Sequence, residues 1–312
     1  MIDLTKLQTF LLVAEYRNFT TAAKHLNLTQ PTISHHIGAL EQGLSVELFD
    51  RSGADVKLTE AGRLLLPRAR KLLNESVEIG QIMGSLDQHI AGHIRIACST
   101  TSGKYILPQL AGRFHIQNPG VSLSILRCAP EHVALRLLDA EANLGVVSSE
   151  VCGGNIECQE LFIDHIALIA PANHPWSLRQ QIEPIELLEA PFIIRESTSG
   201  TLRVMLSELN KNDISIDDMD VFLEIGNSEA IVRTVEAGFG VSFVSRLAAN
   251  WALTQKSVVE IPVAGFDLRR TVYMVRQAHQ AANRAVEVFW RFIHDPTNID
   301  LLNLAYHFNN LG

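Results

Sequence analysis

The stretch that most constrains this chain is residues 18–58, where two short helical patterns flank a tight turn. Small apolar residues line one face of the first pattern and let a second helix cross at close distance. These residues are Ala22, Ala23 and Leu26. Phe19 stands before them, and Thr20 and Thr21 are expected to cap this helix. In the second pattern, apolar residues recur at i, i+4 and i+7 and predict one buried stripe. These residues are Ile33, Ile37 and Leu40. The stretch predicts a helix-turn-helix that ends in a small β-wing.

The exposed face of the second helix is polar and has no charged partner within reach. Thr29 caps this helix, and the exposed side chains are those of Gln30, Thr32, Ser34, His35 and His36. Hydroxyl, amide and imidazole groups on the N-terminal half of an exposed helix can contact base edges and phosphates in a major groove. Basic residues on the wing are expected to contact phosphates. The predicted DNA-binding residues are Thr29, Gln30, Thr32, Ser34, His35, Arg51 and Lys57.

An ordered set of residues in this stretch resembles a known family. The set is Phe19-Thr20-x-Ala22-Ala23-x-x-Leu26-x-Leu28-x-Gln30-Pro31-x-Ile33-Ser34, then Leu40-Glu41, Leu48-Phe49-x-Arg51 and Leu58-Thr59-x-Ala61-Gly62. It resembles the winged helix-turn-helix of LysR-type transcriptional regulators. The resemblance implies a regulator that assembles as a dimer or tetramer on interrupted palindromes. His35 stands where the family often has Arg, Lys or Gln, so the preferred DNA sequence stays open.

Charge is distributed unevenly along the chain. The 312 residues carry a formal net charge of −8, which argues against coating of nucleic acid along the whole surface. Residues 17–71 hold eight Lys or Arg against five Asp or Glu, as expected if this part alone contacts DNA. The N-terminus has no signal-peptide pattern, and no apolar run approaches the roughly 18 residues that a membrane span requires. We expect a cytoplasmic protein that binds double-stranded promoter DNA and no membrane.

A long helix is predicted over residues 60–90. Large apolar residues recur in it at every seventh position. These residues are Leu65, Leu72, Ile79 and Leu86. Such a stripe has to bury itself against another helix, so it predicts self-association through this helix, and the family resemblance points the same way. Packing of the stripe on its own domain is the alternative. The choice between dimer and tetramer stays open.

From residue 91 onward, strand patterns alternate with helix patterns and predict a mostly parallel sheet. Two such sets, joined by strand crossovers near residues 163–169 and 266–272, are expected to form two lobes with a cleft between them. This part resembles the periplasmic-binding-protein-like effector domain of the same family. The predicted fold class is α/β with an all-α winged helix-turn-helix N-terminal domain, a long linker helix and a two-lobed effector domain.

The predicted boundaries follow from these patterns. The winged helix-turn-helix is assigned to residues 1–59, the dimerising linker helix to 60–90 and the effector domain to 91–295. Within the effector domain, lobe I comprises residues 91–163 and 267–295, and lobe II comprises 164–266. Residues 296–312 form a C-terminal tail, whose apolar residues predict a short extra helix.

Three polar stretches open helices and are candidates for binding a small molecule. They contain Ser99, Thr100 and Thr101 in one lobe, Ser197, Thr198, Ser199, Gly200 and Thr201 in the other, and Asn227 before a third helix. Hydroxyl and free backbone N–H groups at a helix N-terminus favour an anion, and strand ends in open α/β sheets face the crevice. Simple N-capping is the alternative reading of each stretch. The resemblance implies that these positions line the effector cleft, so a small anionic metabolite is the predicted effector.

The first of these stretches narrows the candidate effectors. The run Ser99-Thr100-Thr101-x-Gly103-x-Tyr105-x-Leu107-Pro108 is similar to family members that control carbon dioxide fixation or sulfur assimilation. This similarity implies that the effector is a phosphorylated sugar, a 2-phosphoglycolate-like acid, 2-oxoglutarate or a sulfur precursor. RNA polymerase is a further candidate partner. The target genes and the direction of regulation cannot be read from the sequence.

Catalytic motifs are not found in the sequence. There is no Gly-x-Ser-x-Gly elbow and no Walker loop, and Gly238-Phe239-Gly240 lacks the third glycine of a dinucleotide loop. We therefore predict no enzyme activity, no cofactor and no metal. A solute-binding protein and an enzyme built on the α/β lobes are the alternatives from other functional classes.

Four cysteines are present and form no Cys-x-x-Cys pair: Cys98, Cys128, Cys152 and Cys158. In a cytosolic chain the simplest expectation is that all four are reduced core residues. Two alternatives stay open. Cys152 and Cys158 form a redox pair, as in the peroxide-sensing members of the family, or Cys98 is a reactive residue beside the cleft.

Overall fold

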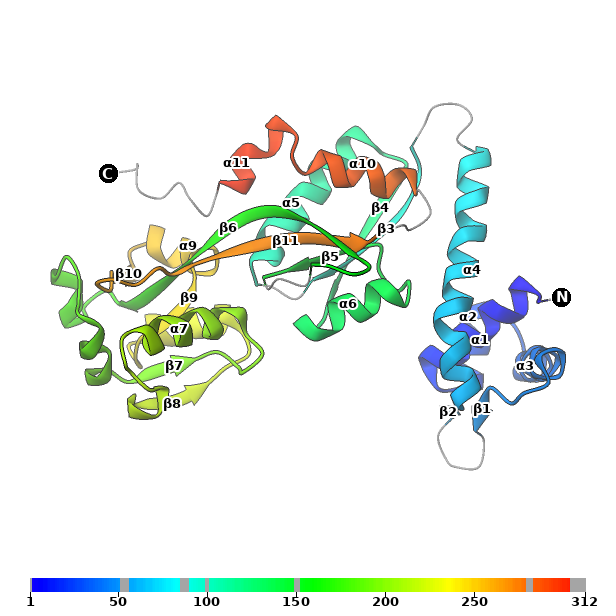
Figure 1. The fold of residues 1–312 in the computed structure, drawn as a ribbon, viewed down its shortest axis with the longest axis horizontal. Helices are drawn as coiled ribbons and strands as arrows, with labels where there is room; N and C mark the ends of the chain where they lie inside the picture. Colours follow the sequence, from blue (N-terminus) through cyan, green and yellow to red (C-terminus); the bar gives the residue numbers. More distant parts are fainter. Residues whose placement is uncertain are drawn as a thin grey trace.

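The computed structural model describes residues 2–50, 56–84, 90–98, 101–148, 152–278 and 283–303. Three units follow one another along the chain: a compact N-terminal domain, a long helix and a pair of α/β lobes (Figure 1). The N-terminal domain lies at one end of the molecule in Figure 1. Lobe I lies in the middle, and lobe II lies at the other end.

The N-terminal unit, which we call the winged domain, contains three helices and a two-stranded antiparallel wing. They are α1 (Leu4–Tyr16), α2 (Phe19–Leu26), α3 (Gln30–Leu44), β1 (Phe49–Asp50) and β2 (Lys57–Leu58). Its core joins Leu7 and Phe10 of α1 to Ala22 of α2 and to Ile33 and Ile37 of α3. The predicted helix-turn-helix and wing are therefore confirmed.

The cap of α2 differs from the prediction. Asn18 has extended backbone angles, and its side-chain oxygen accepts a hydrogen bond from the backbone N–H of Thr21 at 2.9 Å. An amide side chain in this position satisfies one of the N–H groups that a helix start leaves without a partner. The expectation that Thr20 and Thr21 cap the helix was wrong, because α2 already begins at Phe19.

A single long helix, α4 (Glu60–Gly84), links the winged domain to lobe I. Leu65 and Ala69 pack in the core of the winged domain. Farther along, Arg70 forms an ion pair with Glu141 at 2.6 Å, and Asn74 donates a hydrogen bond to the carbonyl of Ala140 at 3.0 Å. The helix therefore contacts both the winged domain and lobe I of its own chain.

Lobe I is built on a sheet of mixed direction. Its strands are β3 (Gly92–Cys98), β4 (Val121–Arg127), β5 (Leu144–Val147), the first half of β6 (Ile156–Pro171) and β11 (Arg269–Gln277). β3 pairs in parallel with β4 and β5, whereas β11 is antiparallel to both β5 and β6. The prediction of a mostly parallel sheet was therefore wrong. The two strands that connect lobe I with lobe II, β6 and β11, are antiparallel to each other.

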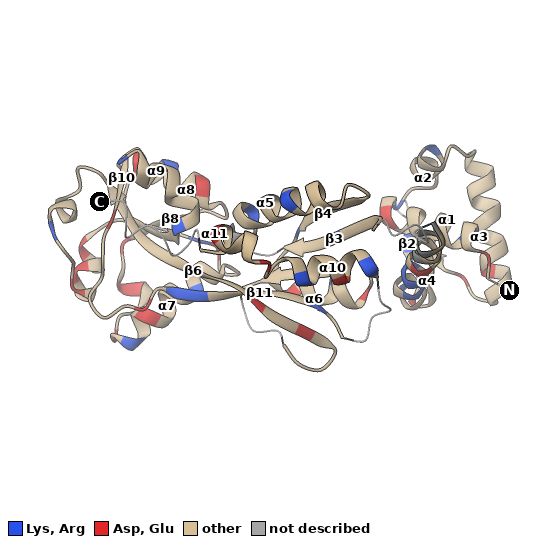
Figure 2. Cartoon of the chain, turned by 90° about the horizontal axis from the view of Figure 1, so that it is seen from above, with Lys and Arg blue, Asp and Glu red and all other residues tan. Residues whose placement is uncertain are grey.

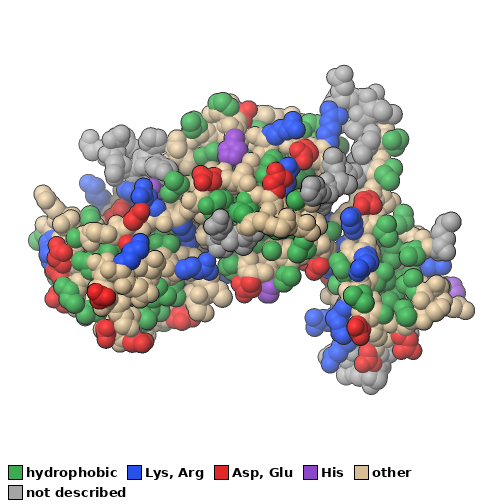
Figure 3. Space-filling model, viewed as in Figure 1, with side chains coloured by type: hydrophobic (Ala, Val, Ile, Leu, Met, Phe, Trp, Pro, Cys, Tyr) green, Lys and Arg blue, Asp and Glu red, His purple; other side chains and the backbone are tan. Residues whose placement is uncertain are grey.

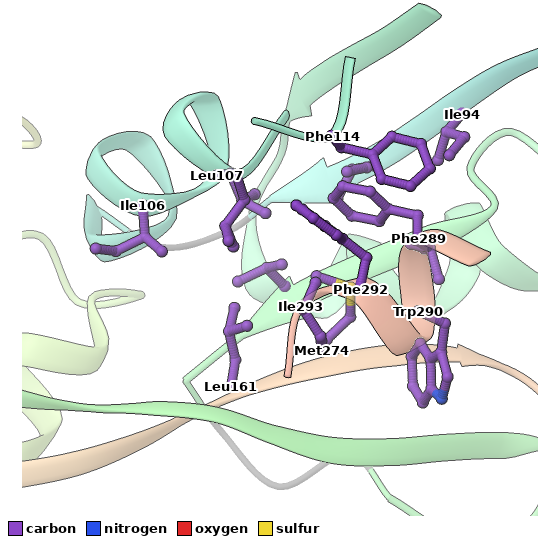
Figure 4. Close-up of a cluster of buried hydrophobic side chains, with 14 of the residues drawn as sticks. Ile94, Ile106, Leu107, Phe114, Leu161, Met274, Phe289, Trp290, Phe292 and Ile293 are labelled. Atoms are coloured by element: carbon purple, nitrogen blue, oxygen red, sulfur yellow. The ribbon is translucent and has the colours of Figure 1, made fainter. Parts of the chain in front are cut away.

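Helices cover both faces of this sheet, because successive side chains of a strand point to opposite faces. The helices are α5 (Thr101–Gln117) and α10 (Arg284–Phe292) on one face and α6 (Pro130–Leu138) on the other. On the first face, the rings of Phe114 and Phe289 lie 5.0 Å apart, edge to face, in one cluster with Ile94 and Met274 (Figure 4). The predicted extra helix is present as α11 (Ile299–Leu302), whose Leu301 is buried in the same cluster.

Lobe II carries its own strands and helices around a second core. They are β7 (Phe192–Ile194), α7 (Gly200–Lys211), β8 (Val221–Glu224), α8 (Ser228–Glu236), β9 (Ser242–Ser245), α9 (Arg246–Thr254) and β10 (Val258–Glu260), with 3-10 turns at Pro175–Leu178, Pro184–Glu189 and Ile216–Asp218. α9 and β10 were not predicted. β9 and β10 pair in antiparallel fashion with the second half of β6.

The lobes are joined through two strands. The first half of β6 pairs with β11 in lobe I, and its second half pairs with β9 and β10 in lobe II. The sequence predicted a crossover strand near residues 163–169, which covers only part of β6. At the crossover, Asp164 of β6 lies directly opposite Arg270 of β11. Any movement of one lobe relative to the other has to pass through this pair of strands.

Candidate DNA-binding face and interlobe site

The predicted polar residues of α3 lie outside its buried stripe. Gln30 and His35 are exposed, and Thr32 and Ser34 are half-buried. The hydroxyl of Thr29 accepts a hydrogen bond from the backbone N–H of Thr32 at 3.4 Å, and the amide of Gln30 donates to the hydroxyl of Ser34 at 3.0 Å. These five residues therefore lie close together along the N-terminal half of one helix.

His36 has a structural contact that the sequence did not reveal. Its Nδ1 lies within hydrogen-bond distance, 3.0 Å, of the hydroxyl of Thr9, a fully buried residue of α1. This contact joins α3 to α1 inside the winged domain. The polar face of α3 is therefore smaller than predicted, with His35 as its exposed imidazole.

The wing and its neighbourhood supply exposed cations. Lys57 is exposed in β2, opposite Asp50 of β1, whereas Arg51 lies outside the described residues. Lys and Arg side chains are visible over the winged domain in Figure 3. Lys24 of α2 and Arg63 at the start of α4 are exposed as well. Neither residue was predicted to contact DNA.

Two predicted effector residues act as helix caps. Ser199 is 5% exposed, and its hydroxyl accepts a hydrogen bond from the backbone N–H of Thr201 at 3.2 Å. The side-chain oxygen of Asn227 accepts from the N–H groups of Glu229 and Ala230 at 2.9 and 3.1 Å. The N-capping reading therefore applies to both residues.

Five further predicted effector residues differ in how far the structure describes them. Ser197 and Thr198 are exposed just before α7. Ser99 and Thr100 lie outside the described residues. Thr101 is the first residue of α5, but its side chain is not described.

Thr201 has an environment that capping does not explain. The residue is 1% exposed, and its hydroxyl has no hydrogen-bond partner among the described residues. A buried hydroxyl without a partner costs roughly 1–3 kcal/mol relative to a satisfied one. Its place in the first turn of α7 puts it beside the backbone N–H groups of a helix start.

The start of α7 touches lobe I directly. A Cβ atom on Gly200 would lie 2.5 Å from the hydroxyl of Ser148, which follows β5, and 2.8 Å from Nη1 of Arg270. Real Cβ atoms essentially never come that close to another heavy atom, so any other residue at position 200 would have to displace Ser148 or Arg270. Gly200 and Thr201 therefore lie at the junction between the lobes.

Charged residues that were not predicted from the sequence lie beside this junction. Asp164 is fully buried and accepts hydrogen bonds from Nε and Nη2 of Arg270 at 2.9 and 2.6 Å and from the hydroxyl of Ser245 at 2.7 Å. On another side of the junction, Glu229 of α8 contacts Lys104 and Tyr105 of α5. Residues so distant in sequence leave no local signal that they meet.

The cysteines do not follow the simplest expectation. Cys152 and Cys158 form a disulfide, so the prediction that all four are reduced core residues was wrong for this pair. Cys98 is buried and Cys128 is partly buried, and neither belongs to this disulfide. Burial raises the pKa of Cys128 above its usual value. In the parts of the chain that the structure describes, no cluster of three or more His, Cys, Asp or Glu could hold a metal ion.

Comparison with known proteins identifies the chain. Residues 87–297 match the family described as "LysR substrate binding domain", and residues 4–63 match "Bacterial regulatory helix-turn-helix protein, lysR family". The chain belongs to the LysR family. Within the described residues, no helix is both long and apolar enough to cross a membrane.

LysR relatives match nearly the whole chain. An uncharacterized HTH-type transcriptional regulator of Methanocaldococcus jannaschii is 32% identical over 286 residues, which cover 92% of this chain and 96% of that protein. A probable RuBisCO transcriptional regulator of Nostoc sp. is 29% identical, with 94% and 89% of the two chains covered. The predicted LysR resemblance, including the likeness to regulators of carbon fixation, is confirmed.

Solved LysR structures confirm the fold class. A full-length OxyR variant from Pseudomonas aeruginosa has a TM-score of 0.73 at 21% identity, with 97% of this chain and 95% of that chain covered. The regulatory domain of Synechocystis CcmR, solved in complex with 2-PG, has a TM-score of 0.59 at 25% identity and covers 65% of this chain and 95% of that one. The protein is a transcriptional regulator with a DNA-binding helix-turn-helix and a substrate-binding domain, and it is not an enzyme.

Proposed function

We propose that this LysR-family regulator reads its operator with the exposed side of α3 and senses a small anionic metabolite at the junction of its lobes. Binding of the metabolite shifts the lobes about the crossover strands β6 and β11 and re-aims α4. The winged domains of an assembled dimer or tetramer then change their spacing on DNA. RNA polymerase is the partner through which this change alters transcription of target promoters.

The chemistry of α3 supports the operator-reading part of the proposal. Its exposed side offers the amide of Gln30, the hydroxyls of Thr32 and Ser34 and the imidazole of His35. Such groups make base-edge contacts in a major groove, whereas a lysine or arginine on a wing contacts phosphates. His35 is proposed as a base contact and Lys57 as a phosphate contact.

Substitution of His35 with alanine is expected to weaken operator binding by about 1–3 kcal/mol, because one base contact is lost. The fold should be unaffected, since His35 is exposed and lies off the buried stripe. Gel-shift titration of the operator against a scrambled duplex measures the effect. His132→Ala, an exposed histidine of lobe I, is the matched control and should leave binding unchanged.

A second variant separates base reading from charge. Lys57→Ala should weaken operator and scrambled duplexes alike and reduce the slope of log K against log salt by about one. His35→Ala should leave that slope unchanged. Equal operator affinity for His35→Ala and the wild-type chain would show that another side of the winged domain reads the bases.

The observation that carries the sensing proposal is the hydroxyl of Thr201, buried at the interlobe junction without a hydrogen-bond partner among the described residues. It stands in the first turn of α7, where helix N–H groups and the helix dipole favour an anion by roughly 0.3–1 kcal/mol, and by up to about 2 kcal/mol when partly buried. An anionic ligand at this helix start would accept the hydrogen bond that Thr201 now lacks. The CcmR regulatory domain was solved in complex with 2-PG, which makes this anion the first probe.

Replacement of Thr201 with valine should separate ligand binding from stability. Valine keeps the shape and removes only the hydroxyl, so the free protein should be as stable as the wild type or slightly more stable. A hydrogen bond to a charged ligand contributes about 1.5–3 kcal/mol, so affinity should fall roughly 10- to 150-fold. Calorimetry with 2-PG, other phosphates, carboxylates and neutral analogues measures this, together with thermal unfolding of the free protein.

The matched control for this variant is Thr234→Val in α8 of the same lobe. The hydroxyl of Thr234 donates to the carbonyl of Ala230 within its own helix at 2.9 Å, so its loss should not change ligand affinity. A clear preference of the wild-type chain for neutral or cationic compounds would contradict the proposed ligand class. Unchanged affinity in Thr201→Val would move the site away from the start of α7.

Self-association through α4 is part of the proposed function, with a smaller seam than the sequence suggested. Leu65 packs in the winged domain of its own chain, which does not fit its predicted place in the seam. Leu72 and Ile79 are 42% and 61% exposed in the single chain. Leu86 lies outside the described residues. The proposed seam therefore involves the second half of α4, where Figure 3 shows apolar side chains on the surface.

A further inference from the structure

A carboxylate joins the two lobes on the α5 side. Glu229, in the first turn of α8 in lobe II, accepts a hydrogen bond from the hydroxyl of Tyr105 at 2.8 Å and lies 3.1 Å from Nζ of Lys104. Both donors belong to the first half of α5 in lobe I. Figure 2 shows the starts of α5 and α8 side by side. The contact therefore crosses from one lobe to the other.

Glu229 is not needed to cap the N-terminus of α8. The start of α8 is already capped by Asn227, whose side-chain oxygen accepts from the N–H groups of Glu229 and Ala230. The carboxylate of Glu229 instead points away from α8 and accepts hydrogen bonds from two donors on lobe I. The geometry is that of a ligand carboxylate held by an ammonium and a phenol.

The protonation states suit this contact. Burial, and then the hydrogen bond to Glu229, hold the pKa of the Tyr105 hydroxyl well above its usual value, so it remains a donor. The hydrogen bonds from Tyr105 and Lys104 hold the pKa of Glu229 below its usual range, so the carboxylate stays ionised at neutral pH. Hydrogen bonds to an ionised acceptor are stronger than those between neutral groups.

We propose that Lys104 and Tyr105 form an anion subsite on α5, which Glu229 fills in the effector-free chain, so that Glu229 acts as a built-in carboxylate that latches the lobes. The subsite takes a carboxylate or phosphate group of the effector when Glu229 leaves it. The role of Lys104 and Tyr105 as an effector subsite rests on the proposed function, because it requires an anionic effector. The latch between the lobes does not depend on the proposed function.

Hydrogen exchange of the full, effector-free chain tests the latch. Glu229→Ala is introduced in lobe II, and exchange is read by mass spectrometry in the first half of α5 in lobe I. Loss of a half-exposed ion pair and one hydrogen bond should speed exchange there about three- to tenfold. Arg233→Ala is the matched control, because Arg233 pairs with Glu236 within α8 at 2.8 Å and, among the described residues, forms no ion pair with α5.

A double variant with the two charges swapped controls for a simple loss of structure in α8. Lys104→Glu combined with Glu229→Lys restores an ion pair between the helices and should return exchange in α5 toward the wild-type rate, whereas each single change should not. Exchange in α5 that is equal in Glu229→Ala and Arg233→Ala would overturn the latch. So would a double variant no slower than its single variants.

Calorimetry with 2-PG tests the subsite. With its internal competitor removed, Glu229→Ala should bind 2-PG about three- to tenfold more tightly than the wild-type chain. Tyr105→Phe should bind it more weakly. Unchanged affinity in both variants overturns the subsite. If 2-PG and the other anions fail to bind the wild-type chain, the anionic effector is wrong and the subsite falls with it, while the exchange measurement still decides the latch.

Discussion

Replacement of Arg270 with methionine is expected to destabilise the chain by about 3–5 kcal/mol, because removal of one partner of a buried ion pair leaves the other charge uncompensated. Asp164 is fully buried and Arg270 is 8% exposed. Two guanidinium nitrogens reach the same carboxylate oxygen at 2.6 and 2.9 Å. Without them, the hydroxyl of Ser245 is the side-chain donor that remains to Asp164 among the described residues. The loss falls on the two strands that connect the lobes.

Urea unfolding of the full chain, followed by circular dichroism, measures this loss. Arg269→Met is the control at the neighbouring position, where the side chains of Arg269 and its partner Asp267 are both more than half exposed. Its effect should stay below about 1 kcal/mol, as for other surface ion pairs. Combining Arg270→Met with Asp164→Leu should recover much of the stability, because an apolar pair can replace a buried ion pair. Equal effects of Arg270→Met and Arg269→Met would contradict the structural role of the pair.

Local periodicity accounts for what the sequence predicted well. The stripe of α3 and the strand-helix alternation of the lobes repeat within a few residues, so each could be read without knowing the tertiary fold. The first half of β6 was missed because it alternates imperfectly: it pairs with β11 on one side, and part of it is exposed. α9 was missed because Arg246 begins it directly after β9, with no turn residues between the two elements.

Contacts between distant residues explain what the sequence did not predict. His36 was assigned to the polar face of α3 because its partner Thr9 stands 27 residues earlier. Glu229 and Tyr105 are 124 residues apart, and Asp164 and Arg270 are 106 apart. Hydroxyl-rich helix starts were easy to find. Their cap role at Ser199 and Asn227, and the different environment of Thr201, depended on the backbone geometry of each helix start.

The seven-residue repeat of α4 shows the same limit. A repeat reveals a stripe but not the surface that covers each part of it. Ala69 is fully buried and Leu65 packs in the winged domain, so the first turns of α4 belong to their own chain. Leu73 still packs against the winged domain, whereas Leu72 and Ile79 are 42% and 61% exposed and Val77 and Met83 are each 60% exposed. This half remains available for a second copy of the chain.

Leu72→Glu is therefore expected to convert the assembled protein into folded monomers that no longer bind the operator. In a single chain position 72 faces solvent, so the new carboxylate is hydrated and the fold should survive. In a helix-to-helix seam the same carboxylate would be buried without a partner, at a cost of several kcal/mol. Loss of the second winged domain removes the avidity gain of about 10²- to 10⁴-fold that two linked DNA-binding domains provide.

Light scattering coupled to size exclusion measures the mass, circular dichroism checks the fold, and gel shift measures operator binding. Lys71→Glu is the matched control, because it introduces the same side chain at an exposed position outside the seven-residue repeat. It should keep the assembled mass and a stable complex with the operator, although its added negative charge can weaken DNA binding at low salt. If Leu72→Glu keeps the wild-type mass while Lys71→Glu does too, α4 does not form the seam. Self-association would then have to use another surface of the chain.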